Sequence, residues 1–266
     1  MAAILCFDIE TIPDVEGIRL LQGLPASMPA AEVAEMAFAA RRDKTGKDFL
    51  PLHCHRVVAI ACLMKEEVEK GSRYTLKCIG TAQDSESRII QQFYKLVDRY
   101  TPQLVSWNGS GFDAQVLHYR GMIHGVSAPR YWDWGDDDRD FKWNNYLSRY
   151  HTRHLDLMDM LALYSARANA PLDELAKLCG FPGKMGMDGS QVWPAYQEGR
   201  IEEIRAYCET DVANTFLLYQ RFMLMRGVFD QEKYQAEMDE LRATISRLPG
   251  EHWKQYLAAW TPRVFD

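Results

Sequence analysis

Features that mark secreted, membrane-bound or disulfide-stabilised proteins are missing from this sequence. Its six cysteines include no Cys-x-x-Cys pair, and several lie in apolar runs, where a thiol behaves as a small hydrophobic group. No apolar segment approaches the ~20 residues of a membrane helix, and no basic region precedes the apolar start of the chain. We therefore expect a protein of the reducing cytoplasm that is neither exported nor membrane-anchored.

An excess of positive charge and a phosphate-binding loop are also absent. The chain has 31 basic and 37 acidic residues, and its net charge of −6 argues against a protein that coats long duplexes by releasing counterions. A nucleic-acid enzyme is still compatible with this charge, because a carboxylate-rich metal site is negative until its ions bind and then attracts phosphate. No Gly-x-x-x-x-Gly-Lys-Ser/Thr sequence occurs, which excludes a P-loop nucleotide-binding protein.

The composition is that of an ordinary globular protein. Of the 266 residues 47% are hydrophobic, 26% charged and 12% aromatic, enough to build a core without metal or disulfides. No linker divides the chain. We expect one domain over 1–266, with an insertion at about 12–55, an aromatic and acidic loop at about 130–153, and C-terminal helices after about 228.

The apolar run at the start of the chain ends in two carboxylates, and the rest of the chain can be organised around it. Strand side chains alternate, so Asp8 and Glu10 share one side of the sheet while Phe7 and Ile9 share the other. Adjacent carboxylates need a counter-charge, and Mg²⁺ commonly supplies it. The alternative without a functional role is that both carboxylates simply lie in solvent at the end of a strand. The Asp-x-Glu pattern recurs three times, but only this copy follows a strand-like run, where ligands collect in open α/β sheets.

Downstream patterns predict further strands and helices. A continuous apolar run and an alternating run flank turn residues and form a hairpin, and apolar residues at helical spacing mark several helices. The predicted strands lie at 57–64, 73–79, 103–107 and about 154–156, and the predicted helices lie at about 30–42, 89–97, 113–124, 157–164, from 171, 200–226 and 234–248.

Two further acids occupy positions suited to a shared site. A polar, glycine-bearing turn, 107–113, follows the strand at 103–107 and opens a helix, which puts Asp113 in a first helical turn. A carboxylate there also simply complements the helix dipole. On the long late helix, Tyr207 and Asp211 are four residues apart and share a face. The same spacing at Tyr94 and Asp98 makes that pattern weak in isolation.

Two charged segments have both structural and functional interpretations. The basic residues at 41–47 suit phosphate contacts, although such a run is more often a solvated face. Aromatic residues between cations at 130–153 suit base stacking on a single strand. The acidic residues in the same segment would repel phosphate, so core packing with a solvated acidic turn is the preferred interpretation there.

The three motifs are specific in combination. Asp8-x-Glu10, Asn108-x-x-x-Phe112-Asp113 and Tyr207-x-x-x-Asp211 occur in this order on a strand end, a helix start and a late helix. This set resembles the motifs of the DEDDy 3′-5′ exonucleases. Its first two members look like those of family-B DNA polymerase proofreading domains. The whole chain resembles the stand-alone bacterial predicted polymerase-B-like 3′-5′ exonucleases, over roughly residues 3–224.

The resemblance implies a fold and a subtype. The fold is ribonuclease-H-like, an α/β architecture with a five-stranded mixed sheet, its first three strands antiparallel, and helices on both faces. In the histidine subtype of these enzymes a histidine stands five residues before the last acid, but that position here is Ala206. The tyrosine subtype is therefore the one supported.

The resemblance also implies site roles. The four acids would hold two Mg²⁺ or Mn²⁺ ions about 3.5–4 Å apart and hydrolyse phosphodiester bonds by in-line attack, with Tyr207 orienting the attacking water. Asn108 and Phe112, together with Thr11 beside the first motif, would position the terminal nucleotide. The implied catalytic residues are Asp8, Glu10, Asp113, Tyr207 and Asp211.

The expected substrate is nucleic acid with a 3′ end, single-stranded DNA before RNA, and the product is nucleoside 5′-monophosphate. No protein partner can be inferred. An exoribonuclease remains an alternative, because the metal site handles the phosphate and other residues must sense the 2′-OH. A non-catalytic nucleic-acid-binding module on the same fold is a second alternative.

Overall fold

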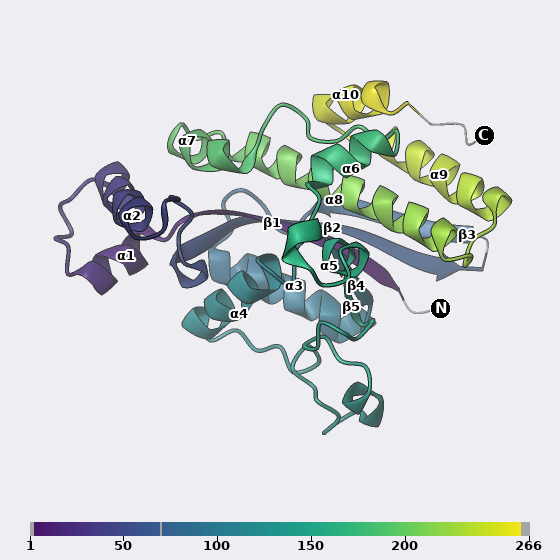
Figure 1. Cartoon of the computed structure of the whole chain (residues 1–266), viewed down its shortest axis with the longest axis horizontal. Helices are drawn as coiled ribbons and strands as arrows, with labels where there is room; N and C mark the ends of the chain where they lie inside the picture. The colour runs from purple at the N-terminus through teal and green to yellow at the C-terminus, as the bar shows by residue number, and fades with distance from the viewer. Residues whose placement is uncertain (1–2, 70, 262–266) are drawn as a thin grey trace.

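The computed structural model describes residues 3–69 and 71–261, so residues 1–2, 70 and 262–266 of the predicted domain lie outside the described part. Five strands form one sheet in the order β3-β2-β1-β4-β5, with helices on both of its faces (Figure 1). The strands are β1 (Ile4–Pro13), β2 (His55–Val68), β3 (Gly71–Cys78), β4 (Gln103–Ser106) and β5 (His154–Asp156).

The pairing of the strands confirms the predicted mixed sheet. β1 pairs antiparallel with β2, and β2 pairs antiparallel with β3. On its other edge β1 runs parallel to β4, which runs parallel to β5. This is the ribonuclease-H-like arrangement that the resemblance implies. β1 lies at its centre and continues to Pro13, so Asp8 and Glu10 lie inside the strand and not at its end, where the sequence pattern predicted them; they follow the point where the neighbouring β4 ends.

The helices divide between the two faces of the sheet. One face packs against α3 (Glu86–Tyr100) and α4 (Asp113–His124), and its core includes Phe7 and Ile9. The other face packs against the long helix α8 (Ile201–Met225), whose neighbours include α6 and α9. The remaining α-helices are α1 (Val15–Gln22), α2 (Ala30–Thr45), α5 (Leu157–Leu161), α6 (Leu172–Leu178), α7 (Val192–Gln197), α9 (Gln231–Ile245) and α10 (Glu251–Ala259).

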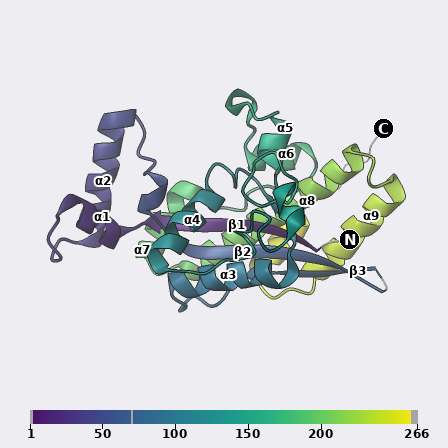
Figure 2. The same ribbon diagram turned by 90° about the horizontal axis from the view of Figure 1, so that it is seen from below.

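The 12–55 connection carries two α-helices where the sequence predicted one. α1 was missed because it has only eight residues, although Asp14 caps its start by accepting a hydrogen bond from the Gly17 amide and Gly23 ends it in the left-handed conformation. α1 and α2 extend beyond the sheet at one end of the molecule (Figure 2). A short 3₁₀ helix, η1 (Leu52–Cys54), leads from them into β2.

The 130–153 segment is part core and part surface. Tyr131, Phe141 and Tyr146 are buried, which confirms the preferred interpretation for these residues, whereas Trp143 is 83% exposed. Asp133 accepts hydrogen bonds from the amides of its own turn, and these lower its pKa despite its burial. The segment includes the 3₁₀ helix η2 (Arg139–Lys142). In the described part of the chain, no helix combines the length and apolar character needed to cross a bilayer.

Candidate active site

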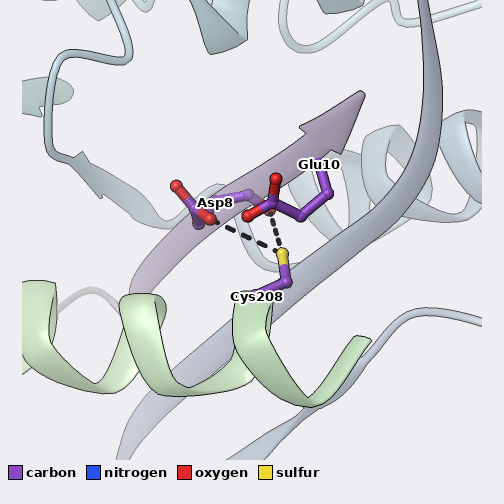
Figure 3. A group of neighbouring side chains, drawn as sticks. All are labelled: Asp8, Glu10 and Cys208. Carbon is purple, nitrogen blue, oxygen red and sulfur yellow. Dashed lines mark hydrogen bonds between the residues drawn. The ribbon is translucent and has the colours of Figure 1, made fainter. Parts of the chain in front are cut away.

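Asp8 and Glu10 project from β1 toward α8, as the strand period predicted. Their registry partners on β2 are Ala61 and Ala59, whose small side chains leave room on this face, and the ladder shifts register immediately after Glu10. Cys208 of α8 faces both carboxylates (Figure 3). Glu10 is 8% exposed, so this stretch of the strand places a carboxyl group in a nearly dry environment.

Asp113 reaches the same place from the start of α4. The backbone amide of Ile9, between the two acids of β1, donates a hydrogen bond to Asp113 Oδ1 at 3.1 Å. The turn before α4 is tight, because a side chain on Gly109 would overlap Ser106. Glycine at that position lets the chain turn closely enough to bring Asp113 back against the strand.

Tyr207 and Asp211 come from α8, one helical turn apart. Both are 5% exposed. The negative charge of Asp211 raises the pKa of Asp8 and Glu10, which places its carboxylate within electrostatic reach of both. The structure therefore brings the three sequence motifs, which lie far apart in the sequence, together on one face of β1.

Burial raises the pKa of all four carboxylates, and repulsion within the cluster adds to this for Asp8 and Glu10. For Asp8 and Glu10 burial is the largest cause and the neighbouring acids add to it, so both pKa values lie well above their usual range. Burial raises the pKa of Asp113 to about 7 and that of Asp211 to about 6. A buried group of carboxylates in this state is stabilised when a divalent cation supplies the missing positive charge.

The residues present fit a divalent metal. One ligand atom from each of Asp8, Glu10 and Cys208 lies within 4.8 Å of the others. Asp211 Oδ1 is buried without a hydrogen-bond partner, although buried carboxylate oxygens are normally satisfied. Carboxylate oxygens are the donors that Mg²⁺ and Mn²⁺ prefer. An unsatisfied oxygen beside converging carboxylates is the arrangement expected of a metal site.

Lys184 belongs to the site although the sequence analysis did not select it. Its Nζ donates a hydrogen bond to the Tyr207 phenol oxygen at 2.6 Å and lies 3.8 Å from Asp211 Oδ2. Its loop is fixed to α8, because the Asn214 side chain bonds both the amide and the carbonyl of Gly183. The only signal in the sequence is a lysine between Gly183 and Gly186, which does not stand out from other loop lysines.

A cleft of about 620 Å³ opens beside Glu10 and is lined by Thr11, Phe112, Phe49 and Trp193 among others. Thr11 is already engaged, since its hydroxyl lies 2.9 Å from Nδ1 of a histidine at the start of β2. Thr11 and Phe112 thus lie together next to the acids, as their predicted role requires.

Asn108 lies apart from this pair. It is exposed, has a positive φ of 65° and lines a separate cleft of about 490 Å³. Its backbone amide donates to Asp156 Oδ1 at 3.0 Å, and its carbonyl accepts from the Phe112 amide. Asn108 therefore shapes the turn that presents Phe112 and Asp113, and it lines the neighbouring cleft instead of the cleft beside Glu10.

Two further residues of the types that build the site, an acid at a strand end and the tyrosine of the duplicate Tyr-x-x-x-Asp spacing, have structural roles. Asp156, at the end of β5, caps α5 and accepts hydrogen bonds from four amides, two of them in the turn before α4. Tyr94 is 2% exposed and packs against Phe93 and Tyr131 in the core on the opposite face of the sheet. Tyr94 is thus remote from the carboxylates, whereas Asp156 borders them, because its charge raises the pKa of Asp113.

Comparison with known proteins agrees with this geometry. A model of the family described as predicted 3′-5′ exonuclease related to the exonuclease domain of PolB matches residues 47–260. The match contains Asp113, Tyr207, Lys184 and Asp211, and it begins after Asp8 and Glu10, which the fold brings to the same point. A search of curated proteins found no match. The chain belongs to this family of predicted 3′-5′ exonucleases related to the exonuclease domain of PolB.

Proposed function

We propose that the chain, as one domain over 1–266, is a metal-dependent 3′-5′ exonuclease that acts on single-stranded DNA in preference to RNA and releases nucleoside 5′-monophosphates. The observation that supports this most strongly is the convergence of four carboxylates from β1, α4 and α8, with Asp211 Oδ1 left unsatisfied. Buried free thiols such as Cys6 and Cys62 are consistent with a reducing, cytoplasmic location.

Asp8, Glu10, Asp113 and Asp211 would hold two Mg²⁺ or Mn²⁺ ions. Bound there, the ions would activate the attacking water and stabilise the departing 3′ oxygen of an in-line displacement. The protein contributes the placement of the four acids, since the Ile9 amide fixes Asp113 against β1 and α8 fixes Asp211. This division of labour is typical of phosphodiester hydrolysis, in which positioning and charge account for most of the catalysis.

Tyr207 would orient the attacking water. Burial and the neighbouring carboxylates hold the pKa of its phenol far above the ordinary value, so the group is neutral and is a poor base. Its oxygen accepts a hydrogen bond from Lys184 Nζ and its hydroxyl donates to the Asp211 carboxylate, so the two partners hold the phenol beside the acids, where the attacking water would bind. Lys184 is a positioning residue in this scheme, because it acts through Tyr207 and Asp211.

The cleft beside Glu10 would receive the 3′-terminal nucleotide. Its aromatic wall, formed by Phe49, Phe112 and Trp193, suits an unpaired base, because every base offers a face for stacking. Thr11 would lie close to the sugar and the scissile phosphate. Asn108 lines the neighbouring cleft. We therefore assign it either a contact with a nucleotide further along the substrate or only the role of shaping the turn.

Hydrolysis of matched 5′-labelled DNA and RNA oligonucleotides tests the proposal. We expect stepwise shortening from the 3′ end in Mg²⁺ or Mn²⁺, faster on DNA, and no shortening in excess chelator. Asp8→Asn should abolish it, because the amide keeps the shape and loses the charge, whereas the control Asp98→Asn should remain active.

Three results would change the conclusion. Faster loss of RNA would favour the exoribonuclease alternative. Binding of oligonucleotide without hydrolysis in any divalent ion would favour a non-catalytic module. Shortening from the 5′ end would contradict the proposal outright.

A further inference from the structure

A thiol stands among the carboxylates of the site, and the proposed hydrolysis gives it no task. Cys208 is fully buried, and its Sγ lies 3.4 Å from the Asp8 backbone oxygen and 3.5 Å from Asp8 Oδ2 (Figure 3). Together with Glu10, these side chains offer one sulfur and two carboxylate oxygens within 4.8 Å of one another. The set of donors is thus mixed, and two of its members are also ligands of the proposed Mg²⁺ site.

A fourth donor is available beside them. Asp211 is 5% exposed, and its Oδ1 is buried without a hydrogen-bond partner. Its charge raises the pKa of both Asp8 and Glu10, so the carboxylate lies within electrostatic range of them, although outside the 4.8 Å that encloses the other three ligand atoms. Cys208 and Asp211 are three residues apart on that helix and therefore neighbours on its surface.

The spacing of the sulfur and the oxygen matches one class of metal. Tetrahedral zinc has Zn–S bonds of about 2.3 Å and Zn–O bonds of about 2.0–2.2 Å, which separate the two ligand atoms by about 3.5–3.7 Å. The Cys208 thiol donates a hydrogen bond to Asp8 Oδ2 at 3.5 Å, so a zinc ion that replaced the thiol proton would find the two ligand atoms already at this separation. Mg²⁺ takes oxygen ligands in near-octahedral geometry and leaves thiolates to softer metals.

We propose that Asp8, Glu10 and Cys208, completed by Asp211 Oδ1, form a second mode of metal binding, selective for a thiolate-seeking divalent cation such as Zn²⁺. Coordination replaces the thiol proton, which leaves to solvent. Zinc in this mode takes ligands away from Mg²⁺ or Mn²⁺ and inhibits hydrolysis. The inhibition rests on the proposed function, whereas the binding of zinc does not.

Cobalt spectroscopy tests the binding directly. Co²⁺ replaces Zn²⁺ in such sites and reports a bound thiolate by a sulfur-to-metal charge-transfer band. We expect this band in the wild-type protein and its loss when Zn²⁺ displaces the cobalt, since zinc binds N, O and S sites more tightly. Cys208→Ala should abolish the band and weaken zinc binding by more than the ~10–100-fold that loss of an outer-shell partner costs.

Cys62→Ala is the matched control. Cys62 is also buried, but it belongs to the core on the opposite face of the sheet, so its removal should leave the band intact. Cys78 is unsuitable as a control, because it interacts with Cys208 itself. Cys208→Ser offers a second variant with nearly the same volume, and its hydroxyl gives no charge-transfer band. A wild-type protein without the band, or a band retained in either Cys208 variant, would overturn the proposal.

The activity measurement separates this proposal from the proposed function. Added Zn²⁺ should inhibit Mg²⁺-dependent hydrolysis by the wild-type protein, and the ratio of inhibited to uninhibited rate should rise at least tenfold in Cys208→Ala. Equal inhibition of both proteins would contradict the competition. If the chain hydrolyses no oligonucleotide at all, the cobalt spectra still decide whether the thiol binds metal.

Discussion

The hydroxyl of Tyr207 gives the sharpest test of the catalytic assignment. Tyr207→Phe removes one oxygen and keeps the ring, so packing on α8 and the four carboxylates should persist. The lost contacts are the 2.6 Å hydrogen bond from Lys184 Nζ and the hydrogen bond to the Asp211 carboxylate, which a metal ion would take over as its ligand. Because the Lys184 side chain is 33% exposed, water can replace this partner. We therefore expect a loss of folding stability of about 1.5 kcal/mol or less, at the low end for a charged hydrogen bond.

The expected loss of rate is larger. A positioned proton-handling group contributes ~10²–10⁴-fold. The raised pKa of Tyr207 keeps the phenol neutral, so it can orient water without accepting the proton. The effect should therefore lie near ~10²-fold, or about 2.7 kcal/mol of activation free energy. The assay is single-turnover cleavage of a 5′-labelled oligonucleotide with enzyme in excess, which isolates the chemical step from product release.

Two tyrosines supply controls for this measurement. Tyr219 lies on the same helix, is 2% exposed and donates its hydroxyl hydrogen to Gln103 Oε1 at 3.1 Å, so Tyr219→Phe removes a comparable hydrogen bond away from the acids. Tyr94→Phe tests the duplicate Tyr-x-x-x-Asp spacing. Both controls should cleave at the wild-type rate. A wild-type rate for Tyr207→Phe, or an equal loss in a control, would refute the assignment of the third motif.

Three further outcomes are expected. Gly109→Ala should cost about 1–3 kcal/mol of folding stability and lower activity, because the new methyl group overlaps Ser106 in the turn that presents Asp113; a wild-type urea midpoint would contradict this. Burial lowers the pKa of His154 to about 4, so between about pH 6.5 and pH 4 the unfolded chain binds a proton at this histidine and the folded chain does not. The contribution of His154 to stability should then fall by about 2 kcal/mol between about pH 8 and pH 5, and the buried carboxylates, whose raised pKa values act in the opposite direction, are common to both proteins. Urea titrations should therefore show wild type losing about that much stability relative to His154→Gln over this range. Single-stranded DNA should be degraded faster than a blunt duplex of the same sequence, given the net charge of −6 and the aromatic cleft; faster loss of the duplex would count against that cleft as the binding site.

Local patterns were sufficient to predict the framework of the site. The alternation along β1 assigned Asp8 and Glu10 to one face, and the structure confirms it because Phe7 and Ile9 have an apolar core to fill on the other. Helical spacing likewise assigned Tyr207 and Asp211 to one face of α8. These predictions depend on backbone geometry that extends over a few residues, which a sequence displays directly.

Contacts between distant loops were not predictable in the same way. Lys184 reaches Tyr207 across 23 residues of sequence, through a loop that Asn214 fixes to α8. Nothing in the local pattern distinguishes that lysine from a solvated one. Cys208 is a different case, since it stands inside the third motif, where nothing in the local pattern shows that its thiol faces the acids. Its proximity to Asp8 depends on how α8 crosses β1, which only the packed structure defines.

The number of metal ions bound by the four carboxylates tests the central claim most directly. Mn²⁺ can be counted by electron paramagnetic resonance during a titration, in the presence of a nucleoside 5′-monophosphate that supplies the product phosphate. We expect two Mn²⁺ ions per wild-type chain and fewer in Asp8→Asn and Asp211→Asn, because each substitution removes a charged ligand. Absence of Mn²⁺ binding in the wild-type protein, or two ions in both variants, would contradict the account.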